Sequence, residues 1–91
     1  MKEKLLYYKK ILQLILRGTS DSKIKFTDLC TMLKVLGFQR RIKGDHHIYS
    51  KEGVDEIINL QPRGNMAKPY QVKQVRTIIL KYKLEVQENE I

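Results

Sequence analysis

The fold depends on the stretch FQRRIKGDHHIYS, residues 38–50, which has the pattern of two strands joined by a tight turn. Phe38, Arg40 and Ile42 alternate with polar neighbours, as residues on one face of a half-buried strand do. Gly44 lies in the turn, and a second turn follows before another apolar run. Two successive hairpins make an antiparallel meander. The sequence therefore predicts three antiparallel strands, over residues 38–42, 46–50 and 54–60.

Three helical patterns flank these strands. The first covers residues 3–17 and ends before Gly18, and its wide apolar stripe needs cover on more than one side. The second starts with Thr27 as its N-cap and ends at Gly37, a residue type common just after helices. The third starts at Pro69, because the fixed φ of proline suits the first helical turn. We predict an α+β fold in which helices cover one face of the sheet.

Length and composition narrow the class of protein. The chain has 91 residues, enough for one domain with a small core. Eighteen Lys and Arg against ten Asp and Glu give a formal net charge of +8, which favours an anionic partner. Cys30 is the only cysteine, which excludes an intramolecular disulfide and a paired-cysteine metal site. The apolar run at residues 11–16 is too short for a spanning helix, and no cleavage site follows it. We therefore expect a cytoplasmic protein without a membrane partner.

Basic residues gather in two places. One group lies on the first strand and its turn and consists of Arg40, Arg41 and Lys43. The other lies between residues 57 and 84, where the chain has no acidic residue: Arg63, Lys68, Lys73, Arg76, Lys81 and Lys83. Contacts from such side chains to phosphates supply sequence-independent affinity that weakens with salt. Because the two groups flank the histidine hairpin, they favour a nucleic-acid partner over a merely solvated basic face.

The candidate catalytic groups are His46 and His47, since histidine titrates close to neutral pH. Strand alternation puts them on opposite faces of the sheet. That geometry does not favour a metal pair, and no serine has the context of a hydrolytic triad. What remains is one general acid–base histidine with cationic helpers. It would deprotonate a ribose 2′-hydroxyl while Arg or Lys stabilises the charge that develops on the phosphate. Spacing alone does not say which histidine acts.

Residues 26–84 resemble the HicA family of toxin proteins. The resemblance rests on the order and spacing of short motifs: FTDLCTML (26–33), LGF (36–38), GDHHIY (44–49), IINLQP (57–62) and VRTIIL (75–80). It implies a fold similar to the double-stranded-RNA-binding domain, in which two helices pack against a three-stranded antiparallel sheet. We expect this HicA-like domain to span residues 23–84. An accessory helix and loop (1–22) would precede it, and an acidic tail (85–91) that frays would follow.

The resemblance also implies an activity, that of a ribosome-independent mRNA endonuclease that a HicB-type antitoxin neutralises. It implies neither a metal nor an organic cofactor. The catalytic histidine of the family follows Gly-Ser or Gly-Gly, which matches His46, and Gly44 matches the glycine that begins the motif. His47 is then expected to be structural. Under this hypothesis five basic residues hold the RNA: Arg40, Arg41, Lys43, Lys73 and Arg76.

Two features depart from the family pattern. Asp45 stands where serine or glycine is usual, so its carboxylate could favour the protonated form of His46, repel a substrate phosphate or simply face solvent. The helix at 3–17 lies outside the compact family core, and we expect it to mediate a homodimer or antitoxin docking. Two alternatives therefore stay open. One is a non-catalytic RNA-binding module of the same fold, and the other is a basic module that binds an acidic protein.

Overall fold

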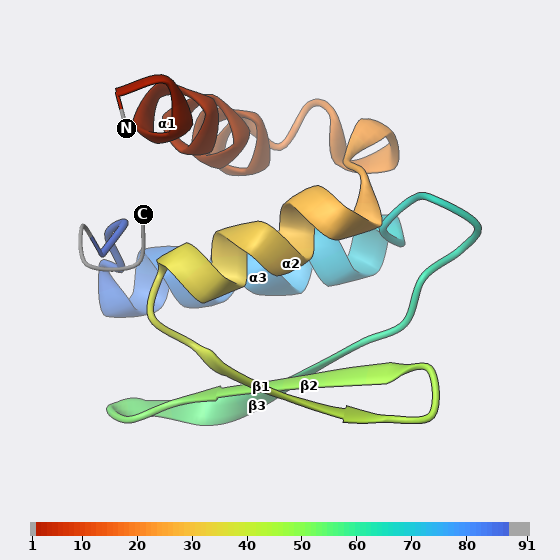
Figure 1. The fold of residues 1–91 in the computed structure, drawn as a ribbon. Coiled ribbons are helices and arrows are strands. Elements are labelled where there is room, and N and C mark those ends of the chain that lie inside the picture. The colour runs from red at the N-terminus through yellow and green to blue at the C-terminus, as the bar shows by residue number, and fades with distance from the viewer. Residues whose placement is uncertain (1, 88–91) are drawn as a thin grey trace.

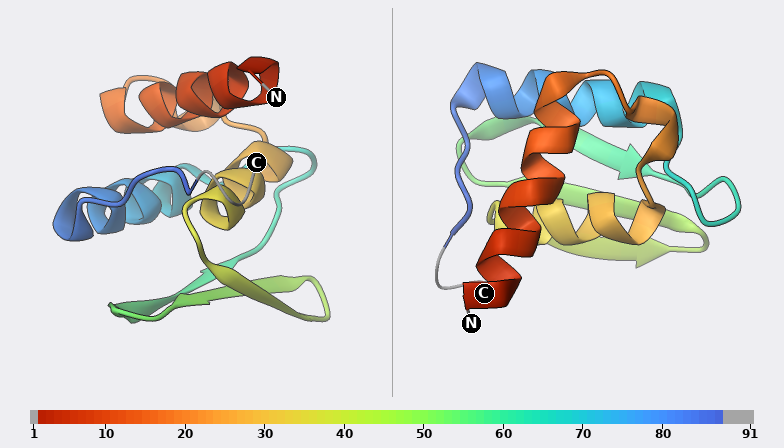
Figure 2. Two further views of the ribbon diagram at one scale, coloured as in Figure 1. Left: turned by 60° about the vertical axis from the view of Figure 1, so that its left-hand side comes forward. Right: turned by 90° about the horizontal axis from the view of Figure 1, so that it is seen from above.

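The protein has three layers. The computed structural model describes residues 2–87, and its elements are α1 (Lys2–Arg17), the 3-10 turn η1 (Asp21–Lys23), α2 (Phe26–Val35), β1 (Gln39–Lys43), β2 (His46–Lys51), β3 (Val54–Leu60) and α3 (Pro69–Tyr82). Helices α2 and α3 lie side by side over one face of the sheet, and α1 crosses them on their far side (Figure 1, Figure 2). Within the described residues, the other face of the sheet carries no helix. The predicted α+β class with three antiparallel strands is confirmed.

The sheet has the strand order β1-β2-β3, with both pairs antiparallel. Gly44 has a φ of +63° at the first position of the turn between β1 and β2, the backbone conformation that glycine provides in two-residue hairpins. Cross-strand partners share a face, so Arg40, Tyr49 and Ile58 form one row and Arg41, Ile48 and Asn59 form the next. Strand β1 pairs on one side only and is therefore an edge strand, and all five of its residues are exposed.

One hydrophobic core lies between the sheet and the helices. The strands contribute their inward residues Tyr49, Ile58 and Leu60, which are buried against apolar side chains of α2 and α3. The α2 and α3 side chains with the least exposure are Leu29, Met32, Leu33, Val72 and Val75. Burying a side chain of this size contributes about 1.5–3 kcal/mol, so these residues are among the main contributors to folding.

Helix α1 shares this core. It ends before Gly18, as predicted, and buries Ile11 and Ile15 against α2 and α3. The wide apolar stripe seen in its sequence is thus covered from two sides, while Leu6 remains 67% exposed. Within residues 2–87, every helix falls short of the length and apolar content that crossing a membrane requires.

The prediction of Thr27 as the N-cap of α2 is wrong. The helix begins one residue earlier, at Phe26, and its N-cap position is Lys25, which makes no side-chain capping bond. The cause is a tertiary contact, because the Phe26 N–H donates to the carbonyl of Asn65 at 2.9 Å. A distant loop therefore satisfies the free amide that a capping hydroxyl would otherwise accept from. The other end follows the prediction, with Gly37 at a φ of +99°.

Helix α3 begins at Pro69, as predicted, and joins the sheet through Glu56 of β3. The Glu56 carboxylate accepts hydrogen bonds from the Tyr82 hydroxyl at 2.6 Å and from the Lys81 ammonium at 2.9 Å. The Tyr82 hydroxyl bond and then the Lys81 bond lower the pKa of Glu56 to about 2. The sheet and α3 are thus fastened at a point near the end of the helix.

After α3 the chain runs back over the core. Leu84 and Val86 pack against it, and the Gln87 N–H donates to the Val35 carbonyl at 2.6 Å. Residues 88–91 of the tail, which the sequence predicts to fray, lie outside the described residues.

Candidate functional site

The two histidines lie on opposite faces of the sheet, as strand alternation predicts. His47 pairs with Ile42 and Leu60 and faces the helices, where its ring meets the edge of Phe26 at 5.0 Å between centroids. Its Nδ1 is buried and has no hydrogen-bond partner. His46 faces the opposite way, onto the side without helices, and 44% of its side-chain surface is exposed. Only His46 is therefore presented openly on the outer face of the sheet.

Asn59 orients the His46 ring. The Nδ1 atom of His46 lies 3.0 Å from the Asn59 Oδ1 atom, across the β2–β3 pair. An amide oxygen can only accept, so we assign the proton to Nδ1, which donates. In the neutral ring the lone pair then belongs to Nε2. His46 consequently offers a proton acceptor on the exposed side of its ring, in an orientation that Asn59 fixes.

Asp45 lies beside that acceptor. Its Oδ1 is 3.8 Å from His46 Nε2, and its Oδ2 accepts a hydrogen bond from Gln61 Nε2 at 2.9 Å. The Gln61 hydrogen bond lowers the pKa of the Asp45 carboxyl, so the group is ionised at neutral pH. The Asp45 carboxylate thus stands beside the exposed nitrogen of the His46 ring. It also adds one negative charge to the surface that any phosphate near Nε2 would meet.

Two of the predicted cations share the face of His46. Lys43 is its direct cross-strand partner, and Arg41 stands two residues away along β1, in line with Ile48 and Asn59. Both side chains are exposed. Arg40 directly precedes Arg41 in sequence and so faces the helix side, next to Tyr49. The outer face thus combines one oriented histidine with two exposed cations.

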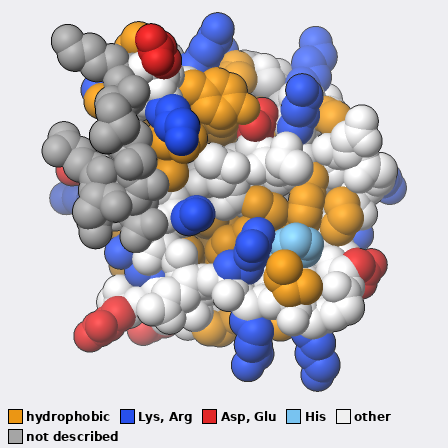
Figure 3. Space-filling view, in the orientation of Figure 1, with side chains coloured by type: hydrophobic (Ala, Val, Ile, Leu, Met, Phe, Trp, Pro, Cys, Tyr) orange, Lys and Arg blue, Asp and Glu red, His pale blue; other side chains and the backbone are white. Residues whose placement is uncertain are grey.

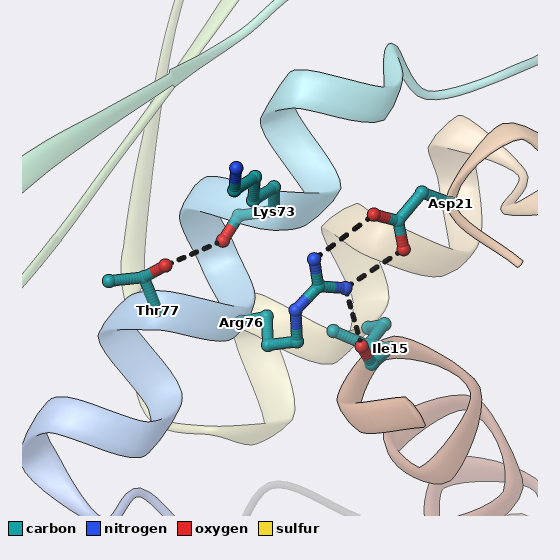
Figure 4. Close-up of polar contacts among 5 residues, drawn as sticks. All are labelled: Ile15, Asp21, Lys73, Arg76 and Thr77. Carbon is teal, nitrogen blue, oxygen red and sulfur yellow. Dashed lines mark hydrogen bonds and ion pairs between the residues drawn. The ribbon is translucent and has the colours of Figure 1, made fainter. Parts of the chain in front are cut away.

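The structure does not bring the two α3 cations to this face. Arg76 donates twice to the Asp21 carboxylate, at 2.9 and 3.1 Å, and once to the Ile15 carbonyl at 3.0 Å (Figure 4). Its side chain is only 17% exposed, and the Asp21 hydrogen bond raises its pKa. Arg76 therefore fastens α3 to η1 and to the end of α1. Lys73 is exposed on α3, in the helix layer, on the other side of the sheet from His46.

Sequence reasoning missed Asn59 and Gln61 as members of the candidate site. Both lie in the stretch IINLQP, where the uniform apolar run at 57–60 hides which residues face inward. The signal that could have found Asn59 is its polarity inside the otherwise apolar run at 57–60. Within residues 2–87, no three His, Cys, Asp or Glu side chains converge to hold a metal ion.

Comparison of the chain with protein-family models, with curated proteins and with solved structures finds no match in any of the three. The resemblance to the HicA family therefore rests on the motifs and their order, and it stays a prediction. The arrangement of His46, Asn59, Asp45, Arg41 and Lys43 carries the functional argument on its own chemistry.

Proposed function

We propose that the protein is a metal-independent endoribonuclease of HicA type, the toxin component of a toxin–antitoxin system, with His46 as its general acid–base group. One observation carries the proposal. Asn59 holds His46 at Nδ1, so that Nε2 opens onto an exposed basic face beside Lys43 and Arg41. This is the minimal set for RNA cleavage, a base for the 2′-hydroxyl and cations for the phosphate.

The reaction proceeds in one displacement. His46 Nε2 removes the proton of a ribose 2′-hydroxyl, and the oxygen attacks the adjacent phosphorus. The bond from phosphorus to the 5′-oxygen breaks as the new bond forms, which leaves a 2′,3′-cyclic phosphate and a 5′-hydroxyl end. The leaving oxygen takes a proton from the imidazolium or from water. Lys43 and Arg41 bind the non-bridging oxygens, where negative charge develops.

Asp45 supports this step because its negative charge stabilises the positive charge that the His46 ring acquires. The imidazolium that forms at His46 faces the Asp45 carboxylate, whose orientation the Gln61 hydrogen bond fixes. The same charge also disfavours phosphate binding close to Nε2, which is the physical argument for the runner-up function, a non-catalytic RNA-binding module. The balance between these two effects decides between a nuclease and a binding module.

The proposal includes two protein contacts. A HicB-type antitoxin would inhibit the enzyme by covering the basic outer face, and an acidic surface would suit it. Helix α1 would mediate a homodimer or the antitoxin contact through its exposed apolar residues, which include Leu6 and Leu16. A third function, a module that only binds an acidic protein, uses the same basic face without RNA.

The test compares wild type with His46→Ala on a labelled mRNA in the presence of EDTA. We expect wild type to cleave, and we expect His46→Ala to bind the RNA with similar affinity without cleaving it. Lys43→Ala should weaken binding, whereas the matched control Lys73→Ala removes the same charge from the helix layer and should change little. Binding without cleavage by wild type would favour the RNA-binding module. Failure to bind RNA at physiological salt, with retained binding to an acidic protein, would favour the interaction module.

A further inference from the structure

A groove opens between α2 and β1, on the side of the sheet opposite to His46. Its volume is about 870 Å³, within the range of small-molecule sites. Its walls include the aromatic rings of Phe26, Phe38 and Tyr49 together with His47. Figure 3 looks onto the side where α2 overlies the sheet, and a histidine lies there among hydrophobic side chains with Lys and Arg close by.

Two buried polar atoms in this groove have no hydrogen-bond partner among the described residues. They are the Tyr49 hydroxyl and His47 Nδ1, and Tyr49 is only 1% exposed. The two residues are two positions apart on β2, so both side chains point toward the helix side. Burial raises the pKa of the Tyr49 phenol well above its usual value, which keeps the hydroxyl protonated and able to donate. Since buried polar atoms are nearly always paired, these two point to a ligand that supplies the missing partners.

The charged residues around the groove favour an anionic ligand. Arg40 and Lys34 are its charged lining residues, and none of the lining residues is acidic. Within residues 2–87, neither cation takes part in an ion pair. An alkyl chain as ligand would pack against the apolar walls but leave the polar atoms of Tyr49 and His47 without hydrogen-bond partners. An aromatic heterocycle with hydrogen-bond donors and acceptors on its edge can pack against the apolar walls and also pair with the two polar atoms. A phosphate attached to this heterocycle can pair with Arg40 and Lys34.

We propose that this groove binds a nucleotide, with the base against the aromatic walls and the phosphate at Arg40 and Lys34. The inference deepens the proposed function and rests on it where the nucleotide belongs to RNA. Strand β1 is the edge of the sheet, and its basic residues alternate between the two faces, with Arg40 toward the groove and Arg41 toward His46. One RNA strand passing round this edge places one nucleotide in the groove and a neighbouring phosphate near the catalytic face.

The experiment follows backbone amide signals by NMR during titration with adenosine 5′-monophosphate, ribose 5-phosphate and a single-stranded oligonucleotide, all in EDTA. We expect the mononucleotide to shift Cys30, Arg40 and Tyr49 in a saturable way, and ribose 5-phosphate to bind at least 10-fold more weakly. Tyr49→Phe keeps the ring and should lower affinity about 2- to 10-fold, the value of one hydrogen bond. Because its hydroxyl has no partner in the free protein, this variant should keep its thermal stability. Arg40→Ala should also weaken binding, whereas Lys73→Ala should not.

Each outcome of this titration either supports or overturns the inference of a nucleotide site. Equal binding of ribose 5-phosphate, shifts confined to His46 and Lys43, or a Tyr49→Phe variant that binds like wild type would overturn the inference. Saturable binding in the groove by a protein that cleaves no RNA would support the groove and refute the nuclease. If Tyr49→Phe and Lys43→Ala each weaken binding of the oligonucleotide, RNA is the source of the nucleotide. If Tyr49→Phe leaves binding of the oligonucleotide unchanged while the mononucleotide still binds in the groove, the ligand is a free nucleotide.

Discussion

The substitution Ile15→Ala tests whether α1 is an accessory to the domain or part of it. Ile15 is fully buried between α1 and the other helices, although it belongs to the segment 1–22 that the sequence sets apart. Truncating a fully buried isoleucine to alanine costs about 2–5 kcal/mol, which combines lost burial with the cavity left behind. A domain of this size has a total stability of about 5–13 kcal/mol, so the loss is a large share of it.

The assay is urea unfolding followed by circular dichroism. At about 1.5 kcal/mol per M urea, the midpoint of Ile15→Ala should fall by roughly 1–3 M. Leu6→Ala is the matched control, because it shortens an exposed aliphatic residue on the same helix and should change stability by less than about 0.5 kcal/mol. A midpoint for Ile15→Ala equal to that of the control would refute the shared core and leave α1 as a separable helix.

Three further predictions concern polar contacts. Asp21→Asn should destabilise the protein by about 1–3 kcal/mol in urea unfolding, because it leaves the partly buried Arg76 guanidinium without its charged partner. The folded pKa of Glu56 lies below its ordinary value, so its contribution to stability is complete above about pH 4.5 and is lost as the pH falls toward 2. The Tm difference between wild type and Glu56→Gln, measured across that range, should shrink accordingly. Asn59→Ala should lower kcat for RNA cleavage with little change in KM, since it releases the His46 ring without removing a phosphate contact.

Each of these has an outcome that contradicts it. An Asp21→Asn variant as stable as wild type would show that the Arg76–Asp21 ion pair does not stabilise the attachment of α3 to η1. A Tm difference for Glu56 that is constant between pH 5 and 2 would contradict the lowered pKa. A rise in KM alone for Asn59→Ala would make Asn59 a substrate-binding residue rather than a positioning one.

Local patterns were sufficient for most of the fold. Glycine and proline punctuation predicts where α1 and α2 end and where α3 begins to within a residue or two, and Gly44 predicts the hairpin that places His46. Prediction fails where distant segments meet. The start of α2 depends on the Asn65 carbonyl, which no local pattern around Thr27 could reveal. The same holds for Ile15, whose burial depends on two helices far along the chain.

The candidate site was predicted in part, for a related reason. Alternation along a strand separates His46 from His47 but does not say which face the helices cover, and only the helix positions decide that. The same alternation divides Arg40 from Arg41, so one basic cluster in the sequence becomes two surfaces in space. Arg76 cannot be recognised as an ion-pair partner from sequence, because Asp21 lies 55 residues away. Asn59 becomes functional only through the register of β2 with β3.

The edge position of β1 has a consequence for how this protein behaves at high concentration. An unpaired strand offers its backbone N–H and C=O groups to any other chain that can extend the sheet. The basic side chains of β1 project to both faces of the sheet. Their positive charge repels the same strand of a second copy and so disfavours pairing between the two strands. We expect the residues proposed to contact RNA to disfavour such strand pairing as well. Neutralising Arg41 and Lys43 together should therefore favour intermolecular strand pairing and aggregation.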